Sequence, residues 1–294
     1  MVNADAAGLQ ATRTDQAEGL RRLLGRNNAR VIVLEAAAAG VGKTSIAINT
    51  AAALATRGLQ VLLLDGNAGA ANISALLGLR PRFDLDDAIG GACAIDDVLL
   101  HGPAGVMVLP AGGALRHGHS ARERERLDAK VMQLAPRFDY VLIDAGAETA
   151  ALRDLSAESI VVLPAAPAAV TGAYALIKQL SAQRPQQRLH VLLNRVSNER
   201  NARQIFDNLR RVAAAHLQAN LESLGHVPGD TQLQRAAEAR QPVTEHAPAS
   251  PAAAGFHRIA AAVAAWSQPA RARSVRATPR SVDFPSYAIA HAGV

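Results

Sequence analysis

The chain has 294 residues, of which 49% are hydrophobic and 19% charged, and its formal net charge is +6. This apolar fraction is sufficient for a buried core, and it excludes a wholly disordered or collagen-like chain. The single cysteine, Cys93, excludes an internal disulfide scaffold and fits a reducing cytoplasm, while the modest positive charge permits nucleic acid or anionic membrane as partners without requiring either.

Composition divides the chain into three zones. Residues 1–30 are polar with one amphipathic segment, residues 31–266 alternate apolar runs with alanine-rich stretches, and residues 267–294 contain prolines and arginines without apolar periodicity. We expect the middle zone to be the packed domain and the last zone to be a basic, disordered tail. No zone has the pattern of a membrane span or of a secretory signal.

An amphipathic helix is predicted in the N-terminal zone. Asp15 is followed three residues later by Glu18, as in a capping box. The apolar residues that then share one helical face are Ala17, Leu20, Leu23 and Leu24.

The middle zone is predicted to be an α/β domain with a mostly parallel central sheet and helices on both faces. Short β-branched or leucine-rich runs, expected to be buried strands, are 31–35, 61–65, 106–110, 140–144, 160–164 and 190–194. Stretches of helical spacing between them include 44–57, 122–134, 171–183 and 201–221. Such a sheet binds ligands at the carboxyl ends of its strands.

A phosphate-binding loop is predicted where the first strand meets the first helix, in the segment EAAAAGVGKT of residues 35–44. Its expected nucleotide-binding residues are Gly40, Val41, Gly42, Lys43, Thr44 and Ser45. Backbone N–H groups would hold the phosphates, Lys43 would reach the β- and γ-phosphates, and Thr44 would hold Mg²⁺. The usual first glycine is replaced by Ala37, so a plain strand-to-helix turn with a solvated lysine is the alternative.

Two later strands end in carboxylates. Asp65 ends the run 61–65 and Asp144 ends the run 140–144, so both are expected beside the loop, where they can organise Mg²⁺ and its waters. The predicted metal site therefore consists of Thr44, Asp65 and Asp144. The alternative is that each aspartate only caps the end of its strand.

In this order, the motifs resemble the MinD/ParA group of deviant-Walker ATPases, P-loop NTPases of the SIMIBI class. The family's loop reads K-G-G-x-G-K-T, and its first lysine, which reaches the partner's phosphates in an ATP-bound dimer, falls on Ala38. The family's second aspartate after L-D-A, which orients the attacking water, falls on Asn67. The resemblance implies ATP or ADP and Mg²⁺ as cofactors, with Asp65 and a degenerate Asn67 as catalytic positions. It also implies weak or absent hydrolysis and a weakened nucleotide-dependent homodimer.

Two further segments resemble the part of this family that holds the base. The segment LLNRV resembles the strand whose asparagine bonds adenine, which places Asn194 at the base with both a donor and an acceptor to offer. The segment VPGD resembles a later loop that borders the adenine, which adds Pro228. Gly172 departs from the family's T-D-A-Y, where an aspartate stands.

The segment DQAEGLR of residues 15–21 resembles D-Q-A-x-x-L-R, which heads the flagellar-number regulators FlhG and FleN. The resemblance covers about residues 12–266. It implies a cytoplasmic regulator of flagellar number and placement whose first helix stimulates an FlhF-type GTPase, with flagellar basal-body switch proteins as further partners. The implied contact residues are Asp15, Gln16, Ala17, Leu20 and Arg21. Peripheral attachment to the inner face of the cell membrane near the flagellar pole is a further implication.

A last helix is predicted over about residues 251–266, with Phe256, Ile259, Val263 and Trp266 on one side. Its polar face is nearly uncharged, which favours a helix packed on the core over one that binds membrane. The competing function is a ParA-like partition ATPase that binds DNA nonspecifically through arginines. Partition proteins lack the pattern of residues 15–21, so we expect no specific nucleic acid partner.

Overall fold

The computed structural model describes residues 29–67, 72–112, 126, 129–131, 133–146, 156, 158–185, 187–217 and 219–266. In this part of the chain, one eight-stranded sheet has the order β3-β4-β2-β5-β1-β6-β7-β8. The strands are β1 (Arg30–Glu35), β2 (Val61–Gly66), β3 (Leu100–His101), β4 (Met107–Pro110), β5 (Tyr140–Ala145), β6 (Glu158–Pro164), β7 (Arg188–Val196) and β8 (Leu221–Pro228). Neighbouring strands pair in parallel except the short β3, which is antiparallel to β4. The predicted mostly parallel sheet is confirmed.

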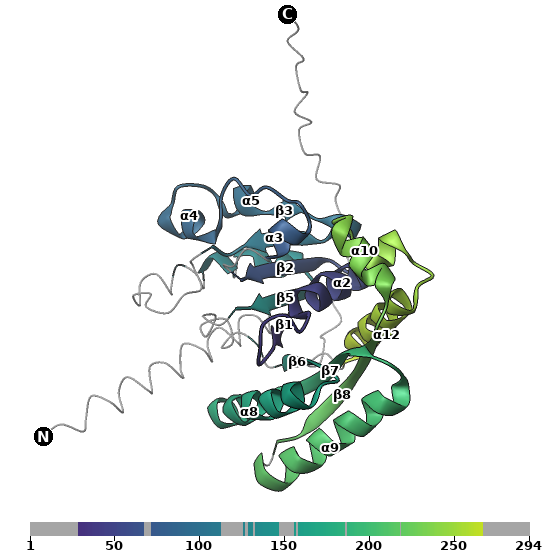
Figure 1. The fold of residues 1–294 in the computed structure, drawn as a ribbon. Helices are drawn as coiled ribbons and strands as arrows, with labels where there is room; N and C mark the ends of the chain where they lie inside the picture. Colours follow the sequence, from purple (N-terminus) through teal and green to yellow (C-terminus); the bar gives the residue numbers. More distant parts are fainter. Residues whose placement is uncertain are drawn as a thin grey trace, which may run out of the picture.

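Helices cover both faces of this sheet (Figure 1). The α-helices are α2 (Lys43–Ala55), α3 (Ile73–Leu76), α4 (Leu85–Gly90), α5 (Ile95–Val98), α8 (Pro167–Gln183), α9 (Glu199–Leu217), α10 (Thr231–Glu238), α11 (Val243–His246) and α12 (Pro251–Ala265). Two 3₁₀ helices are η1 (Pro103–Gly105) and η2 (Ala135–Arg137). None of the helices in these ranges combines the length and the apolarity needed to cross a bilayer.

Strand β1 shows how the apolar runs produce this layering. Ile32 and Leu34 pack into the core shared with α2 and α12, whereas Val31 and Val33 pack into the opposite core with α4 and α5. Because side chains alternate across a strand, a run that is apolar at every position must be covered on both faces. A third core lies between β6, β7 and the adjacent helices α8 and α9.

The helix α12 packs on the core, as its uncharged polar face predicted. Phe256, Ile259 and Val263 are buried against α2 and β8. At its end, the Trp266 ring stacks on His190, with ring centroids 3.8 Å apart, and the Arg30 guanidinium lies 5.1 Å from the Trp266 ring centroid. The apolar side of α12 is therefore covered by the protein itself.

The structure corrects the prediction for residues 201–221. The helix α9 ends at Leu217, and the edge strand β8 follows at Leu221–Pro228. Buried and exposed residues are mixed along this edge strand, and Glu222 and Ser223 are exposed, so β8 lacks the continuous apolar run of the inner strands. The predicted helix over 122–134 lies only partly within the described residues. The N-terminal helix and the tail 267–294 lie outside them.

Candidate functional site

The loop between β1 and α2 has the backbone geometry that an anion site needs. Gly40 has φ +75° and Gly42 has φ +90°, a left-handed region in which other residues are strained. Gly42 is the N-cap residue of α2 and provides no side-chain cap for the first turn of the helix. The N–H groups of this turn, together with the positive end of the helix dipole, are therefore available to an anion.

Asp144 at the end of β5 lies directly against the start of α2. The Lys43 ammonium forms an ion pair with Asp144 Oδ1, and the Thr44 hydroxyl donates a hydrogen bond of 2.7 Å to Asp144 Oδ2. The Asp144 side chain is completely buried, whereas Lys43 is 14% exposed. The three residues, predicted from two separate motifs, thus form one cluster, which excludes a solvated lysine at this turn.

Asp65 at the end of β2 lies beside Asp144 in the parallel register of β2 and β5. Its carboxylate accepts backbone N–H groups of Asn67, at 3.3 Å, and Ser74, at 3.2 Å. Burial, with a smaller contribution from the negative charge of Asp144, raises the pKa of Asp65 to about 6. Ser74 was not predicted, because it contributes only a backbone group and no side-chain pattern marks it.

The oxygen atoms of this cluster fit a hard divalent cation. A hydroxyl and two carboxylates come together, and a cation would offset the unfavourable proximity of Asp65 and Asp144. However, no group of three or more His, Cys, Asp or Glu residues in the described ranges could hold a metal ion. This donor set suits Mg²⁺ that keeps waters and phosphate oxygens as most of its ligands, rather than an all-protein cage.

Asn194 at the carboxyl end of β7 faces the phosphate loop. Its amide Nδ2 donates a hydrogen bond of 2.8 Å to the carbonyl oxygen of Val41, and the residue is 2% exposed. Its Oδ1 is buried and has no hydrogen-bond partner within the described residues. Pro228 pairs with Val196 in the next strand, so it lies at the same edge of the sheet. The position of Asn194 was predicted, but its contact with the loop was not.

Two glycines allow close approach around the loop. A Cβ atom on Gly146 would lie 2.5 Å from the carbonyl oxygen of Gly66, so the ends of β5 and β2 need glycine at this position. A Cβ atom on Gly172, in α8, would lie 3.2 Å from that of Ala37. Gly172, where the family pattern has an aspartate, therefore lies against Ala37, in the first part of the loop. The next residue, Ala38, is exposed and offers no cation.

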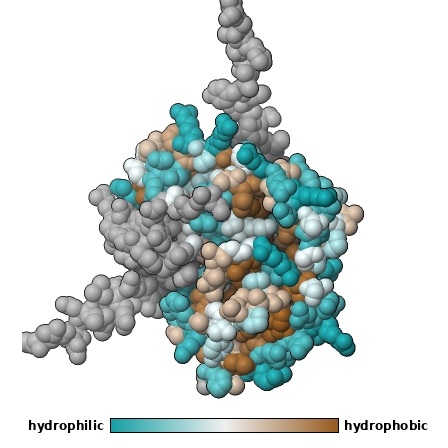
Figure 2. Space-filling view, viewed as in Figure 1, coloured by the Kyte–Doolittle hydropathy of each residue, from teal (hydrophilic) through white to brown (hydrophobic). Residues whose placement is uncertain are grey.

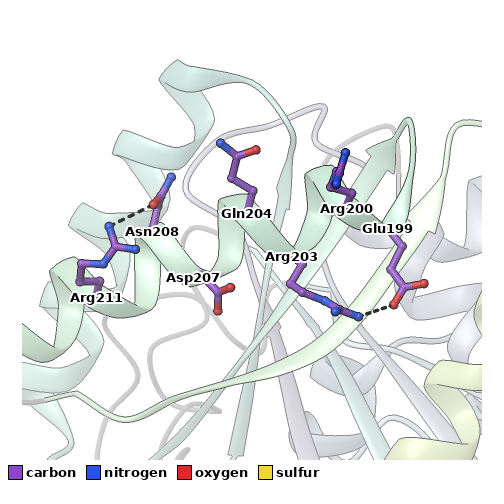
Figure 3. A pocket seen from close by; sticks show the side chains of 7 residues that line it. All are labelled: Glu199, Arg200, Arg203, Gln204, Asp207, Asn208 and Arg211. Atoms are coloured by element: carbon purple, nitrogen blue, oxygen red, sulfur yellow. Dashed lines mark hydrogen bonds and ion pairs between the residues drawn. The ribbon is translucent and has the colours of Figure 1, made fainter.

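Two hollows on the surface of the described residues lie apart from this cluster. One of about 590 Å³ follows the outer face of α9, and all its lining residues come from that single helix, where Arg203 pairs with Glu199 and Arg211 bonds Asn208 (Figure 3). Another, of about 820 Å³, lies between α9, β8 and α12. Figure 2 shows apolar surface between hydrophilic patches on this face of the molecule, in its upper centre as well as in its lower half. Neither hollow is lined by the residues of the phosphate loop.

Comparison with known proteins gives a consistent result. The family described as "CobQ/CobB/MinD/ParA nucleotide binding domain" matches residues 32–243. The antiactivator FleN of Pseudomonas aeruginosa is 34% identical over 250 residues, which cover 83% of this chain and 89% of FleN. The flagellum site-determining protein YlxH of Helicobacter pylori is 25% identical over 76% of this chain and 78% of YlxH.

Solved structures support the fold. The septum site-determining protein MinD of Pyrococcus horikoshii, solved in complex with Mg-ADP, superposes with a TM-score of 0.62. It is 21% identical and the superposition covers 80% of this chain and 96% of that one. At this identity, the likeness concerns the fold alone.

Proposed function

The chain belongs to the CobQ/CobB/MinD/ParA nucleotide-binding family, and from this premise we propose that it is an ATP-binding, MinD-like regulator of flagellar number and placement. The observation that carries the nucleotide-binding part is the contact of Lys43 and Thr44 with Asp144, directly behind a loop with two left-handed glycines. The flagellar part is supported by the similarity to FleN and YlxH.

The cluster also supports a mechanism by which a polyphosphate would be taken up. The Lys43 ammonium pairs with one oxygen of Asp144. A triphosphate offers several charged oxygens, so Lys43 would exchange its carboxylate partner for phosphate, and Asp144 would keep its bond from Thr44. Mg²⁺, when bound, would neutralise phosphate charge, and Thr44, Asp65 and Asp144 are the residues that would hold it.

Hydrolysis is proposed to be weak or absent. Asn67 stands where the family has a water-orienting aspartate, and an amide cannot take up a proton. Loss of such assistance lowers a rate by about 10²- to 10⁴-fold. Ala38 removes the cation that the family places on the partner's phosphates, so ATP-driven dimerisation is proposed to be weakened as well. The protein would then act through the presence of bound nucleotide rather than through rapid ATP hydrolysis.

The partner proposed for the N-terminal segment is an FlhF-type GTPase. The support is the match of residues 15–21 to the family motif, and these residues lie outside the described part of the structure. We place the protein in the cytoplasm, with peripheral contact to the inner face of the membrane and with basal-body switch proteins as further partners. A peptide of residues 10–26 should stimulate GTP hydrolysis by the GTPase, and the same peptide with Arg21→Ala should stimulate it less. Absence of stimulation by the unaltered peptide would remove this partner.

Size measurement of the full chain with and without ATP tests the proposed nucleotide response. We expect little ATP-dependent dimer at protein concentrations where Ala38→Lys, which returns the missing cation, forms more of it. Equal, strong ATP-dependent dimerisation of the two chains would contradict the role assigned to position 38. Salt-sensitive, ATP-dependent binding to nonspecific duplex DNA would instead favour a partition ATPase.

A further inference from the structure

The side-chain amide of Asn194 is in close contact with the back of the phosphate loop. Its Nδ2 lies 2.8 Å from the Val41 carbonyl oxygen, and a Cβ atom placed on Gly42 would lie only 2.4 Å from the same Nδ2. The amide therefore lies against the peptide that joins Val41 to Gly42.

The chemistry of this contact fixes the orientation of the amide. A carbonyl oxygen only accepts hydrogen bonds, so the nitrogen of the Asn194 amide must face Val41 and the oxygen must face away. The buried Oδ1 has no partner among the described residues. One N–H group of the Asn194 amide is therefore used in the bond to the loop. In a side chain that only recognises a base, both the nitrogen and the oxygen of the amide would bond the base.

The two sides of the contact differ in how firmly their backbones are held. Asn194 lies in β7, paired with β6 and β8, next to a register shift at Arg195, whose φ is +57°. Val41, in contrast, lies between two glycines that permit many backbone conformations. The strand therefore positions the loop. Because a trans peptide is planar, fixing the Val41 carbonyl also fixes the direction of the Gly42 N–H, one of the amides available to an anion.

We propose that Asn194 is a positioning residue for the phosphate loop, acting on the phosphates of a bound nucleotide through the Val41–Gly42 peptide and independently of the base. The inference rests on the proposed nucleotide binding and deepens it. It predicts that removal of the Asn194 donor weakens the binding of a ligand that has phosphates and no base.

The test compares ATP with inorganic tripolyphosphate, each with Mg²⁺, by calorimetric titration of the full chain. Asn194→Ala should weaken the binding of both ligands by roughly 5- to 30-fold, because the Val41 carbonyl loses its buried donor. The matched control is Asn208→Ala, an exposed asparagine on α9, which should bind both ligands as the unaltered chain does. Hydrogen exchange of residues 36–44 should be faster in Asn194→Ala than in this control.

A second variant, Asn194→Asp, keeps the side-chain volume and adds a pH readout. At about pH 8, the carboxylate repels the Val41 carbonyl, whereas at about pH 5 a buried carboxyl group carries a proton and can donate. The binding of tripolyphosphate, relative to the unaltered chain at the same pH, should therefore recover towards low pH. Absence of recovery at low pH would contradict the role of a hydrogen-bond donor at this position.

The outcomes separate the two hypotheses. Loss of ATP binding with unchanged tripolyphosphate binding in both Asn194 variants would overturn the positioning role and leave a contact with the base. An unaltered chain that binds neither ligand would overturn the proposed function, and the positioning role with it.

Discussion

Replacement of Gly42 by alanine tests how closely Asn194 lies against the phosphate loop. Gly42 has φ +90°, where an alanine costs about 1–2 kcal/mol in backbone strain. Its new Cβ atom would also stand 2.4 Å from Asn194 Nδ2, so the amide must move and the Val41 carbonyl loses its bond, at about 1–3 kcal/mol. The sum is about 2–5 kcal/mol, a large part of the 5–15 kcal/mol of a typical domain.

Gly40→Ala is the matched control, because Gly40 has a similar φ of +75° and a Cβ atom there meets nothing within 4 Å. Urea unfolding of both variants should give Gly42→Ala the lower free energy of unfolding, and the difference between the two variants should be about 1–3 kcal/mol. ATP affinity should fall more for Gly42→Ala than for Gly40→Ala. Equal stabilities would refute the close contact between Asn194 and the loop.

Three other predictions concern the carboxylates, the last helix and hydrolysis. Burial raises the pKa of Asp65 to about 6, so the folded chain keeps a proton on this carboxyl group at a pH where the unfolded chain has released it. The free energy of unfolding should therefore fall by up to about 3 kcal/mol as the pH rises from about 4 to about 6. The free energy of unfolding, measured by urea titration across this pH range, should fall less in Asp65→Asn than in the unaltered chain. An equal fall in both chains would mean that other groups cause the pH dependence. Phe256 is buried, so Phe256→Ala should destabilise the chain by about 3–5 kcal/mol. Arg258 is exposed on the same helix, and Arg258→Ala should have little effect. Equal, small effects of the two substitutions would mean that α12 is not part of the core. Asn67→Asp combined with Ala38→Lys should raise ATP turnover at least tenfold, and unchanged turnover would show that these two positions do not limit it.

The inner part of the fold follows closely from the sequence. The runs that became β1, β2 and β5 are apolar at nearly every position, and such runs are stable only between two layers of helices. Each also ends in a residue of the site or next to one, so the meeting of Lys43 and Asp144 at one edge could be expected from a parallel sheet. What could not be expected was their direct ion pair, which depends on side-chain reach.

The missed features have two physical causes. The edge strand β8 has one partner strand and irregular register at Leu224, so its pattern of buried and exposed residues is neither continuous nor strictly alternating. The bond from Asn194 ends on a backbone carbonyl, and every residue has one, so residue types do not mark it. The contacts of Ser74 with Asp65 were hidden for the same reason.

The central claim is that the Lys43 cluster forms a site for a polyphosphate, and calorimetric titration of Mg-ATP tests it most directly. Lys178, an exposed lysine on α8, provides the control for loss of one positive charge. We predict that the unaltered chain and Lys178→Ala bind ATP with the same affinity, and that Lys43→Ala, shown by circular dichroism to be folded, binds at least tenfold more weakly. Absence of binding heat in the unaltered chain, or equal affinity in all three, would contradict the account.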